Sequence, residues 1–376
     1  MFFEKLEILK KKRLLRNIRN RESPQGPKIR FGGREYINFS SNDYLGLANN
    51  PLIINKIKKS IDDYGYGSAS SRLLSGGSIL HKELEDRLTK FKGAESALVF
   101  NSGYSANIGI IPAISDENSV IFSDELNHAS IIDGCRLSKG KTIIYRHKDI
   151  PHLEDLVKKE DANSKIIITD TVFSMDGDIA PLNDIYNICK KYRTLLYIDD
   201  AHGTGVLGNG RGALSHFNIK PEPWIIQMGT FSKALGSYGA FAAGSRDVIE
   251  WVQNTSRSFM FSTALPSCII AASIAALELI EENPELIKRL WTNRNKVAEY
   301  IQRIKFNSMQ SETPIISLRT GTVENTLRIS GYLLEKGIFA PAIRPPAVKD
   351  SRIRISVTAT HTDDDIERLI ETLKEV

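Results

Sequence analysis

The sequence contains little cysteine and no long apolar stretch, and both absences limit the class of protein. The three cysteines, Cys135, Cys189 and Cys268, are odd in number and far apart, so neither a disulfide framework nor a structural zinc site is expected. Apolar stretches such as Cys268–Ala276 are shorter than the roughly 20 residues of a membrane span, and the N-terminus lacks the apolar core of a signal peptide. We therefore expect a cytoplasmic protein that binds no metal and enters no membrane.

Repeats, low-complexity tracts and a strong charge of one sign are also missing. With 376 residues, 41% of them hydrophobic and 25% charged, the chain has enough apolar material for a buried core. The 50 basic and 45 acidic residues give a net charge of only +5. Much of this excess comes from Lys10, Lys11, Lys12, Arg13, Arg16, Arg19 and Arg21. The composition predicts a globular protein of one large domain or two of ordinary size.

This basic run could form a patch for nucleic acid or lipid, but apolar residues alternate with it at helical spacing. The apolar residues are Leu6, Leu9, Leu14, Leu15 and Ile18. The pattern favours an N-terminal helix whose basic side faces solvent. Binding of nucleic acid is therefore not expected.

From Ala97 onward, short apolar runs rich in β-branched residues alternate with amphipathic helical stretches. The runs are Ala97–Phe100, Val120–Asp124, Thr142–Tyr145, Ile166–Asp170, Leu195–Asp199, Ile225–Met228 and Ala240–Gly244. Runs that are apolar throughout are typical of strands covered on both faces, and the helices between them imply right-handed crossovers. We predict an α/β fold with a mostly parallel seven-stranded sheet covered by helices, and ligands at the carboxyl ends of its strands.

The pattern changes after Pro266. A long helical region runs to about residue 304, and is followed by a strand at Ile315–Leu318, a helix near Glu324–Lys336, a strand at Arg352–Val357 and a final helix from Asp363. We expect a smaller C-terminal α+β domain over residues 281–376, a large α/β domain over residues 51–280 and an N-terminal helix-and-loop segment over residues 1–50.

Polar residues follow two neighbouring strands of the predicted sheet. Asp199 ends one strand, and His202 follows three residues later. Such a pair can hold a protonated pyridine nitrogen and contact an oxygen of the same ring, although it could equally cap the next helix. Lys233 lies within Gly229–Ser237, among small and hydroxylated residues that would let a phosphate approach. Burial there would favour the neutral amine that adds to an aldehyde, whereas a lone lysine between strands is otherwise a solvated surface residue.

The segment Asn101–Asn107 forms the turn between a predicted strand and a helix. Such a turn offers backbone N–H groups and the positive end of the helix dipole to a phosphate, although any strand-to-helix turn shares this property. The turn lacks the Gly-Lys pair of a P-loop and the three-glycine spacing of a dinucleotide fold. It therefore favours a ligand with one phosphate group over a nucleotide.

A phosphate-binding turn, then Asp-x-x-His, then Ser-x-Lys, each after a strand, resembles the motif order of fold-type I pyridoxal-phosphate enzymes. Within that group the chain is similar to the α-oxoamine synthases, from roughly Glu4 to the C-terminus. The matching segments are Ser41–Leu47, Ser71–Gly76, Asn127–Ser130, Val172–Asp178 and Arg352–Arg354. The resemblance implies pyridoxal 5'-phosphate as the cofactor, a homodimer, and an acyltransferase reaction at the α-carbon of a small amino acid.

The resemblance also assigns roles at the cofactor. Lys233 would hold the cofactor as a Schiff base and act as general base, and Asp199 would pair with the pyridine nitrogen. His128 would stack on the ring, although Asn127 and His128 could simply cap the helix beginning at Ala129. With His202, these residues are the expected catalytic groups. The further cofactor contacts implied are Ser174 and His202 at the ring oxygen, Gly103, Tyr104 and Thr230 beside the cofactor, and Thr263 or Ser262 at the phosphate of the partner subunit.

For the amino-acid substrate, the resemblance implies that Arg354 binds the carboxylate through two hydrogen bonds. Without the family, the better interpretation of Arg354 would be a surface charge on an edge strand. His128, Arg19 and Ala347 are further candidates for substrate binding. The family pattern has threonine at the position of Ala347, so a hydroxyl contact to the substrate is lost or replaced here.

Asp199–Gly205 and Ser71–Gly76 most resemble the family members that join L-alanine to a pimeloyl thioester in biotin synthesis. The acyl carrier could be coenzyme A or an acyl carrier protein. Related members are 2-amino-3-ketobutyrate CoA ligase, 5-aminolaevulinate synthase and serine palmitoyltransferase. A non-catalytic partner subunit would commonly lack the Schiff-base lysine, so Lys233 argues against that class. A nucleic-acid-binding protein that used the basic run would bind with a steep salt dependence.

Overall fold

The computed structural model describes residues 2–303 and 311–376, and the chain divides into two compact units. The large unit contains Asn50–Phe173 and Ile179–Ile287. The small unit contains Met1–Asn49, Ser174–Asp178 and Lys288–Val376. The N-terminal residues, which the sequence analysis set apart as a segment of their own, are thus grouped with the C-terminal residues.

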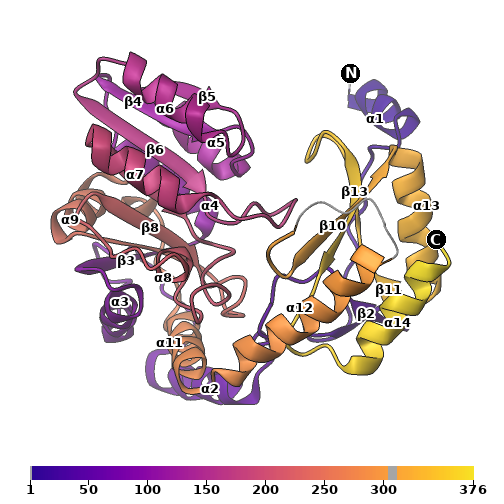
Figure 1. Ribbon diagram of the computed structural model, residues 1–376. Coiled ribbons are helices and arrows are strands. Elements are labelled where there is room, and N and C mark those ends of the chain that lie inside the picture. The colour runs from indigo at the N-terminus through magenta and orange to yellow at the C-terminus, as the bar shows by residue number, and fades with distance from the viewer. Residues whose placement is uncertain (1, 304–310) are drawn as a thin grey trace. The chain divides into compact units, whose positions relative to one another are not determined.

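A seven-stranded sheet forms the centre of the large unit (Figure 1). In spatial order its strands are β3 (Ser96–Phe100), β9 (Ala240–Gly244), β8 (Ile225–Thr230), β7 (Leu195–Asp199), β6 (Ser164–Asp170), β4 (Ser119–Asp124) and β5 (Lys141–Tyr145). β9 is antiparallel to β3 and β8, and the other neighbouring pairs are parallel. Each of the seven apolar runs lies within one strand, so the predicted fold class is confirmed.

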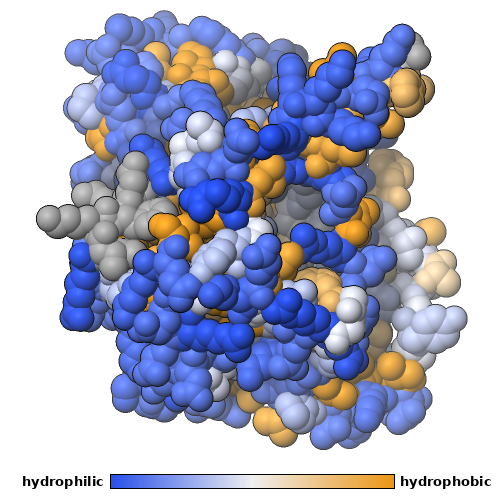
Figure 2. All heavy atoms as spheres, turned by 90° about the vertical axis from the view of Figure 1, so that its right-hand side faces the viewer, coloured by the Kyte–Doolittle hydropathy of each residue, from blue (hydrophilic) through white to orange (hydrophobic). Residues whose placement is uncertain are grey.

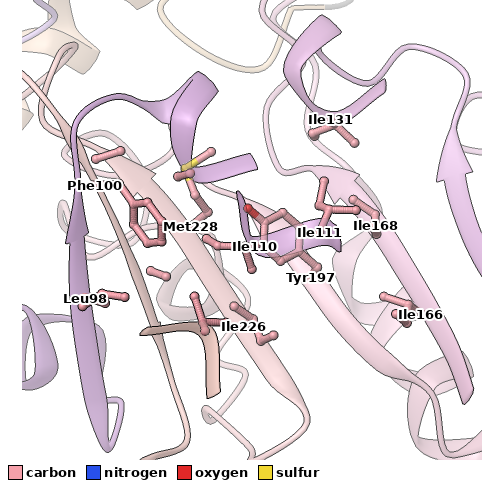
Figure 3. Packing of buried hydrophobic residues seen from close by; sticks show 14 of the residues in the cluster. Leu98, Phe100, Ile110, Ile111, Ile131, Ile166, Ile168, Tyr197, Ile226 and Met228 are labelled. Atoms are coloured by element: carbon pink, nitrogen blue, oxygen red, sulfur yellow. The ribbon is translucent and has the colours of Figure 1, made fainter. Parts of the chain in front are cut away.

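The sheet is buried on both faces except at its edge strand β5, where Lys141, Thr142 and Ile144 are exposed. On one face, side chains such as Leu98, Phe100 and Ile168 pack against α4 (Gly103–Ala113) and α5 (Ala129–Leu137), as Figure 3 shows. The residues between them in the strands point to the opposite face, and they are equally buried. This double burial explains why the strands are apolar without alternation. The other helices of this unit are α2 (Pro51–Tyr64), α3 (Ile79–Lys92), α6 (Ile150–Lys159), α7 (Leu182–Tyr192), α8 (Ala213–His216), α9 (Arg246–Thr255), α10 (Arg257–Met260) and α11 (Ser267–Glu282).

A buried ion pair fastens the loop after β7 to the end of α3. Lys92 Nζ donates to Asp200 Oδ2 at 2.8 Å and to the carbonyl oxygen of Arg211 at 2.6 Å. The two charged side chains are 1% and 0% exposed. The hydroxyls of Thr171 and Thr204 also donate to the Asp200 carboxylate, at 2.7 and 2.9 Å. The carboxylate of Asp200 is therefore fully surrounded by donors, and each donor compensates for part of its lost hydration.

Substituting Lys92 by methionine should lower the free energy of unfolding by about 3–5 kcal/mol, because the buried charge of Asp200 would lose its counter-charge. Urea denaturation followed by circular dichroism would measure the change. The matched control is Lys90→Met, an exposed lysine of the same helix, for which we expect a change below about 0.5 kcal/mol. Equal changes in the two variants would contradict the prediction.

The small unit contains two three-stranded sheets. One consists of β1 (Lys28–Phe31), β2 (Arg34–Asn38) and β11 (Ile338–Phe339), and the other of β10 (Ile315–Gly321), β13 (Ser351–Ser356) and β12 (Ala342–Ile343). The helices are α1 (Phe2–Lys11), α13 (Val323–Glu335), α14 (Asp363–Lys374) and the part of α12 (Glu285–Arg303) from Lys288 onward. β11 pairs with β2 in parallel, and this pairing joins the N-terminal residues to the C-terminal ones.

The elements predicted after Pro266 are present in the structure, with one difference. The long helical region is divided into α11 and α12 at Asn283 and Pro284, since proline lacks the N–H group that a continuous helix needs. Its predicted end at residue 304 lies outside the described residues. The predicted strand, helix, strand and final helix correspond to β10, α13, β13 and α14.

α1 is shorter than the predicted basic helix. It ends at Lys11, and Arg13 adopts a left-handed conformation with φ of 55°. The N–H groups of Arg13 and Leu14 donate to the carbonyl oxygens of Lys10 and Leu9, a pairing that closes the C-terminus of a helix. The expectation that the helix continues through Leu14, Leu15 and Ile18 is therefore wrong.

The face drawn in Figure 2 is mostly hydrophilic, with its hydrophobic residues in small separate groups. Among the residues that the structure describes, no helix combines the length and the apolar character needed to cross a membrane. The same residues include no group of three histidine, cysteine or acidic side chains arranged to hold a metal. Cys135, Cys189 and Cys268 are free thiols, and all three are buried.

A fully buried histidine lies in the small unit. The Nδ1 atom of His361 accepts the N–H of Thr358 at 3.0 Å, and its Nε2 lies 3.1 Å from the carbonyl oxygen of Asn38. The ring stacks on Phe39 with 4.2 Å between centroids. Because Nδ1 accepts, Nε2 carries the proton and the ring is neutral. Burial lowers the pKa of His361 from 6.5 to about 4.

This lowered pKa of His361 should make folding sensitive to acid. Between the unfolded pKa of 6.5 and the folded pKa of about 4, the unfolded chain binds the additional proton. Stability is therefore complete above pH 6.5 and falls as the pH approaches 4, by about 3 kcal/mol for this residue. Urea unfolding at several pH values in this range measures the effect. The free energy of unfolding should depend less on pH in His361→Gln than in the unmodified protein, and its pH dependence should be unchanged in the exposed control His216→Gln.

Candidate active site

Asp199 is the last residue of β7, and its carboxylate is 4% exposed. Its Oδ1 accepts the backbone N–H of Ala201 at 3.0 Å, and its Oδ2 accepts from Asn107 Nδ2 at 2.8 Å. Hydrogen bonds of this kind favour the ionised carboxylate. A carboxylate can accept about four hydrogen bonds, so Asp199 can accept a further donor such as a protonated pyridine nitrogen.

His128 is the N-cap residue of α5. Its Nδ1 atom lies 2.7 Å from Ser130 Oγ and accepts the N–H of Ser130 at 3.3 Å. Its own backbone N–H donates to Asp170 Oδ2 at 2.7 Å. The helix cap, which the sequence left open as an alternative, is therefore present, but it uses only Nδ1. Much of His128 is exposed, so capping and stacking on a ligand ring are compatible.

Four ionisable groups influence one another at this edge of the sheet. Desolvation around the ring lowers the pKa of His128 despite its exposed surface, the Asp199 carboxylate offsets part of this effect, and the Lys233 ammonium adds to it. Burial raises the pKa of Asp170 well above its usual value; the charge of Asp199 raises it further, and Lys233 acts in the opposite direction. The structure therefore gathers Asp199, His128, Asp170 and Lys233 near the carboxyl ends of β6, β7 and β8.

The N-terminus of α4 lies at the same strand-to-helix turn that the sequence analysis selected. Ser102 caps the helix by accepting the N–H of Ser105 at 3.1 Å. The first N–H groups of a helix, here those of Gly103 and Tyr104, have no partner within the helix and lie at the positive end of its dipole. Asn101 Nδ2 donates to the carbonyl oxygen of the exposed Thr263 at 2.7 Å. Thr263 therefore lies beside this turn, which has the features of a phosphate site.

The other predicted cofactor residues of the large unit are placed as follows. Thr230 is buried at the end of β8, where its Oγ1 donates to the carbonyl oxygen of Gly239 at 2.7 Å. His202 is buried in the turn after β7. Tyr104 is exposed, and its hydroxyl donates to Asp133.

Ser174 and Arg354 belong to the small unit, where they are in contact. Arg354 Nε donates to the carbonyl oxygen of Ser174 at 2.6 Å, and Arg354 Nη1 donates to Ser356 Oγ at 2.9 Å. Arg354 Nη2 donates to Asn42 Oδ1 at 3.0 Å and to the Tyr44 hydroxyl at 3.5 Å. Arg354 is 7% exposed, so the alternative interpretation of Arg354 as a surface charge does not hold: the guanidinium lies in a buried polar network.

The neighbours of Ser174 are also held in the small unit. Arg352 forms an ion pair with Asp176, and the Ser317 hydroxyl donates to the carbonyl oxygen of Met175. The carbonyl oxygen of Gly177 accepts the N–H of Glu312 and the hydroxyl of Thr313, both at 2.9 Å. These contacts fix Ser174, Met175, Asp176 and Gly177.

The two weakest substrate candidates lie elsewhere in the small unit. The guanidinium of Arg19 lies over the ring of Phe339, 5.8 Å from its centroid. Ala347 is exposed, and its N–H donates to the carbonyl oxygen of Arg344 at 3.2 Å. Neither residue contacts Arg354 through a hydrogen bond or ion pair among the described residues.

A mostly parallel sheet that carries a lysine, a buried aspartate and a helix N-terminus at its carboxyl edge defines a fold-type I pyridoxal-phosphate enzyme. Residues 34–373 match the model of the family aminotransferase class I and II. The chain therefore belongs to this family.

Two curated relatives extend this likeness over nearly the whole chain. A protein of Thermodesulfovibrio yellowstonii, provisionally named 8-amino-7-oxononanoate synthase, is 52% identical over 370 residues, which are 98% of this chain and 95% of the relative. The 8-amino-7-oxononanoate synthase of Thermoanaerobacter pseudethanolicus is 45% identical over 378 residues, which are 99% of this chain and 95% of the relative. Among solved structures, serine palmitoyltransferase from S. paucimobilis with bound PLP–myriocin aldimine has a TM-score of 0.94 at 26% identity, and the match covers 100% of this chain and 96% of that one.

The structure adds residues that the sequence analysis did not select. Asn107 and Asp170 contact Asp199 and His128, and Asn42 and Tyr44 contact Arg354. Three of these residues lie inside segments already described as motifs, namely Asn107 in Asn101–Asn107 and Asn42 and Tyr44 in Ser41–Leu47. Their polar side chains within these motifs could have indicated a role at the site. Asp170 ends a predicted strand, as Asp199 does, and that shared position was its signal.

Proposed function

We propose that this chain is a pyridoxal-phosphate-dependent acyltransferase that condenses L-alanine with a pimeloyl thioester to give 8-amino-7-oxononanoate in biotin synthesis. The observation that carries the proposal is the cluster of Lys233, Asp199 and His128 at one edge of the sheet. The choice of substrates rests on the relatives named 8-amino-7-oxononanoate synthase, which are far more similar in sequence than serine palmitoyltransferase.

The residues present fit pyridoxal phosphate. Asp199 is a buried carboxylate that can accept one more donor, and the N-terminus of α4 offers N–H groups to a phosphate. Lys233, which is partly buried three residues after β8, supplies the amine. The bound cofactor supplies an aldehyde for the amine and a ring that withdraws electrons from the α-carbon of the substrate.

The chain's own residues would then act on the amino acid. Lys233 removes the proton from the α-carbon as general base. Asp199 would accept the N–H of the pyridine ring, and Asn107 and Ala201 hold its carboxylate in place for this contact. His128 presents its ring for stacking, and His202 and Ser174 bind the side of the ring oxygen. The new bond would join the α-carbon to the thioester carbonyl carbon as the carbon–sulfur bond breaks and the thiol carrier leaves. The bond from the α-carbon to the carboxylate would then break, carbon dioxide would leave, and a proton would return to the α-carbon.

Arg354 would bind the carboxylate of L-alanine. Its hydrogen bonds with Ser174, Ser356, Asn42 and Tyr44 use four of the five N–H donors of a guanidinium. The contact with Tyr44 is the longest, at 3.5 Å, so a carboxylate can displace it most easily. Burial raises the pKa of Tyr44 to about 12, which keeps its hydroxyl protonated and able to donate to the incoming carboxylate.

The proposal includes finer assignments. Thr263 or Ser262 reaches the phosphate of a partner subunit in a homodimer, and the protein acts in the cytoplasm. Arg19 and Ala347 are at the substrate site, and the carrier of the acyl group is coenzyme A or an acyl carrier protein. The second candidate is another α-oxoamine synthase that uses glycine or serine, namely 2-amino-3-ketobutyrate CoA ligase, 5-aminolaevulinate synthase or serine palmitoyltransferase. The TM-score of 0.94 to serine palmitoyltransferase supports this alternative.

The experiment is a substrate panel on the purified, cofactor-loaded protein. L-alanine, glycine and L-serine are each supplied with pimeloyl-CoA, pimeloyl-acyl carrier protein, acetyl-CoA, succinyl-CoA and palmitoyl-CoA, and products are identified by mass spectrometry. We expect 8-amino-7-oxononanoate from L-alanine with a pimeloyl thioester as the fastest reaction. A faster product from glycine or serine would support the second candidate, and no product from any pair would contradict both.

A further inference from the structure

Asn107 is a buried residue of α4 that contacts three polar side chains. Its Nδ2 donates to Asp199 Oδ2 and to Ser130 Oγ, each at 2.8 Å. The Tyr197 hydroxyl donates to Asn107 Oδ1 at 2.5 Å. Because a protonated hydroxyl selects the carbonyl side of the amide, Tyr197 fixes which side of Asn107 faces Asp199. Asn107 is 1% exposed, so water has little access to these bonds.

Ser130 continues the chain of hydrogen bonds to His128. Its Oγ accepts from Asn107, and the same oxygen lies 2.7 Å from His128 Nδ1. The hydroxyl hydrogen is therefore directed toward Nδ1, as is the backbone N–H of Ser130 at 3.3 Å. Nδ1 then accepts both groups, and Nε2 carries the ring proton.

We propose that Asn107 is a positioning residue that makes the negative charge of Asp199 and the Nε2–H tautomer of His128 depend on each other. An ionised Asp199 attracts one hydrogen of the Asn107 amide, which fixes the second hydrogen on Ser130 and leaves the Ser130 hydroxyl to His128. A neutral Asp199 would weaken the first of these bonds and loosen the others. The proposal rests on the proposed function only in giving Asp199 and His128 a cofactor to contact.

The position of Asn107 adds to this coupling. Asn107 lies one helical turn after Gly103, at the end of α4 that offers a phosphate site. One helix would therefore orient the phosphate, the partner of the pyridine nitrogen and the stacking ring together. No residue of this chain needs to move to transmit the effect, because the bonds are already formed.

The other titratable groups near the chain of hydrogen bonds include Asp170, Lys233 and Tyr197. Burial raises the pKa of Tyr197 well above its usual value, so its hydroxyl remains a donor. Burial and the charge of Asp199 raise the pKa of Asp170 in the same direction, which favours its neutral form. The carboxylate that accepts from the Asn107 amide is that of Asp199.

The test compares two variants. Asn107→Ala removes the hydrogen bonds to both Asp199 and Ser130, whereas Ser130→Ala removes only the hydroxyl that links Asn107 to His128. Ser123→Ala is the matched control: Ser123 is buried and accepts from Asn127 Nδ2 at 2.9 Å, outside the chain of Asn107. Circular dichroism verifies that each variant is folded. The first readout needs no cofactor: ring-nitrogen NMR shifts of His128, assigned by their loss in His128→Gln.

We expect the fraction of the Nδ1–H tautomer of His128 to rise in Asn107→Ala and in Ser130→Ala, where the long 3.3 Å bond from the backbone N–H of Ser130 is the donor to Nδ1 that remains fixed, and to stay unchanged in Ser123→Ala. The second readout is the visible absorbance of the bound cofactor against pH. Protonation of Asp199 at low pH should change this absorbance, and the midpoint of the change should move to higher pH by about one unit in Asn107→Ala, since the Asp199 carboxylate loses a hydrogen bond. The midpoint should stay in place in Ser130→Ala and Ser123→Ala.

An unchanged His128 tautomer in folded Asn107→Ala would overturn the proposal, and so would equal movements of this midpoint in Asn107→Ala and Ser130→Ala. If the tautomer responds as expected but the protein binds no pyridoxal phosphate, the coupling stands and the proposed function fails. The two failures are therefore distinguishable.

Discussion

Replacing Lys233 with alanine should lower kcat for the condensation by about 10²–10⁴-fold or more, because the variant lacks the general base for the α-proton. It also lacks the amine that holds the cofactor covalently, so pyridoxal phosphate should be lost on gel filtration. Product formation by mass spectrometry and the cofactor content of the filtered protein measure the two effects. Because the same lysine would serve both purposes, we expect the fall in kcat and the loss of bound cofactor to occur together.

Lys220→Ala is the control for the lysine substitution. Lys220 is exposed and precedes β8, and its substitution should leave kcat and cofactor content unchanged. Normal turnover by Lys233→Ala would refute the assignment of the Schiff-base lysine. Loss of cofactor alone, with normal turnover when pyridoxal phosphate is in excess, would refute only the general-base role.

Asp199→Asn should lower kcat by about 10²–10³-fold, in the range expected when one charged or dipolar group that stabilises a transition state is removed. The substitution keeps the shape of the side chain but removes the negative charge that holds the proton on the pyridine nitrogen. Steady-state kinetics with L-alanine and pimeloyl-CoA measure the effect, and KM for alanine should change little because Arg354 is intact.

Asp170→Asn gives the sharpest comparison for Asp199. Asp170 is also a buried aspartate, it is the last residue of the adjacent strand β6, and it lies opposite Asp199 in the sheet register. Because burial and Asp199 raise the pKa of Asp170 well above its usual value, asparagine resembles the form it already has. The loss in kcat should therefore be much smaller than for Asp199→Asn. Equal losses would mean that the charge of Asp199 is not the property that matters.

The sequence predicts the large sheet well because all of its strands except the edge strand β5 are buried on both faces. Such strands have a continuous apolar signal, and all seven were placed within a few residues. The strands β1, β2, β11 and β12 were not predicted, since they have only two to five residues and several exposed positions. The early end of α1 was missed because Arg13, not glycine, adopts the left-handed conformation that closes the helix.

The catalytic motifs could be found because each follows a strand at a fixed spacing. Asp199, His202 and Lys233 were selected in this way, and their roles stay predictions until the substitutions are tested. The hydrogen-bond partners of Asp199 and Arg354 could not be predicted, because they come from distant parts of the chain. Asn107 lies 92 residues before Asp199, and Asn42 lies 312 residues before Arg354. No local pattern links positions so far apart.

The position of the segment Ser174–Asp178 limits how the protein can be truncated or recombined. It belongs to the small unit, although the residues on either side of it belong to the large unit. The large unit is therefore not a continuous piece of the gene, and neither is the small one. A truncated fragment that ends near residue 287 would keep these five residues while losing Arg352, Arg354 and Ser317, their partners. Recombination between relatives at a single crossover near that point would likewise separate Asp176 from the arginine that neutralises it, so viable chimaeras should exchange this loop and the C-terminal residues together.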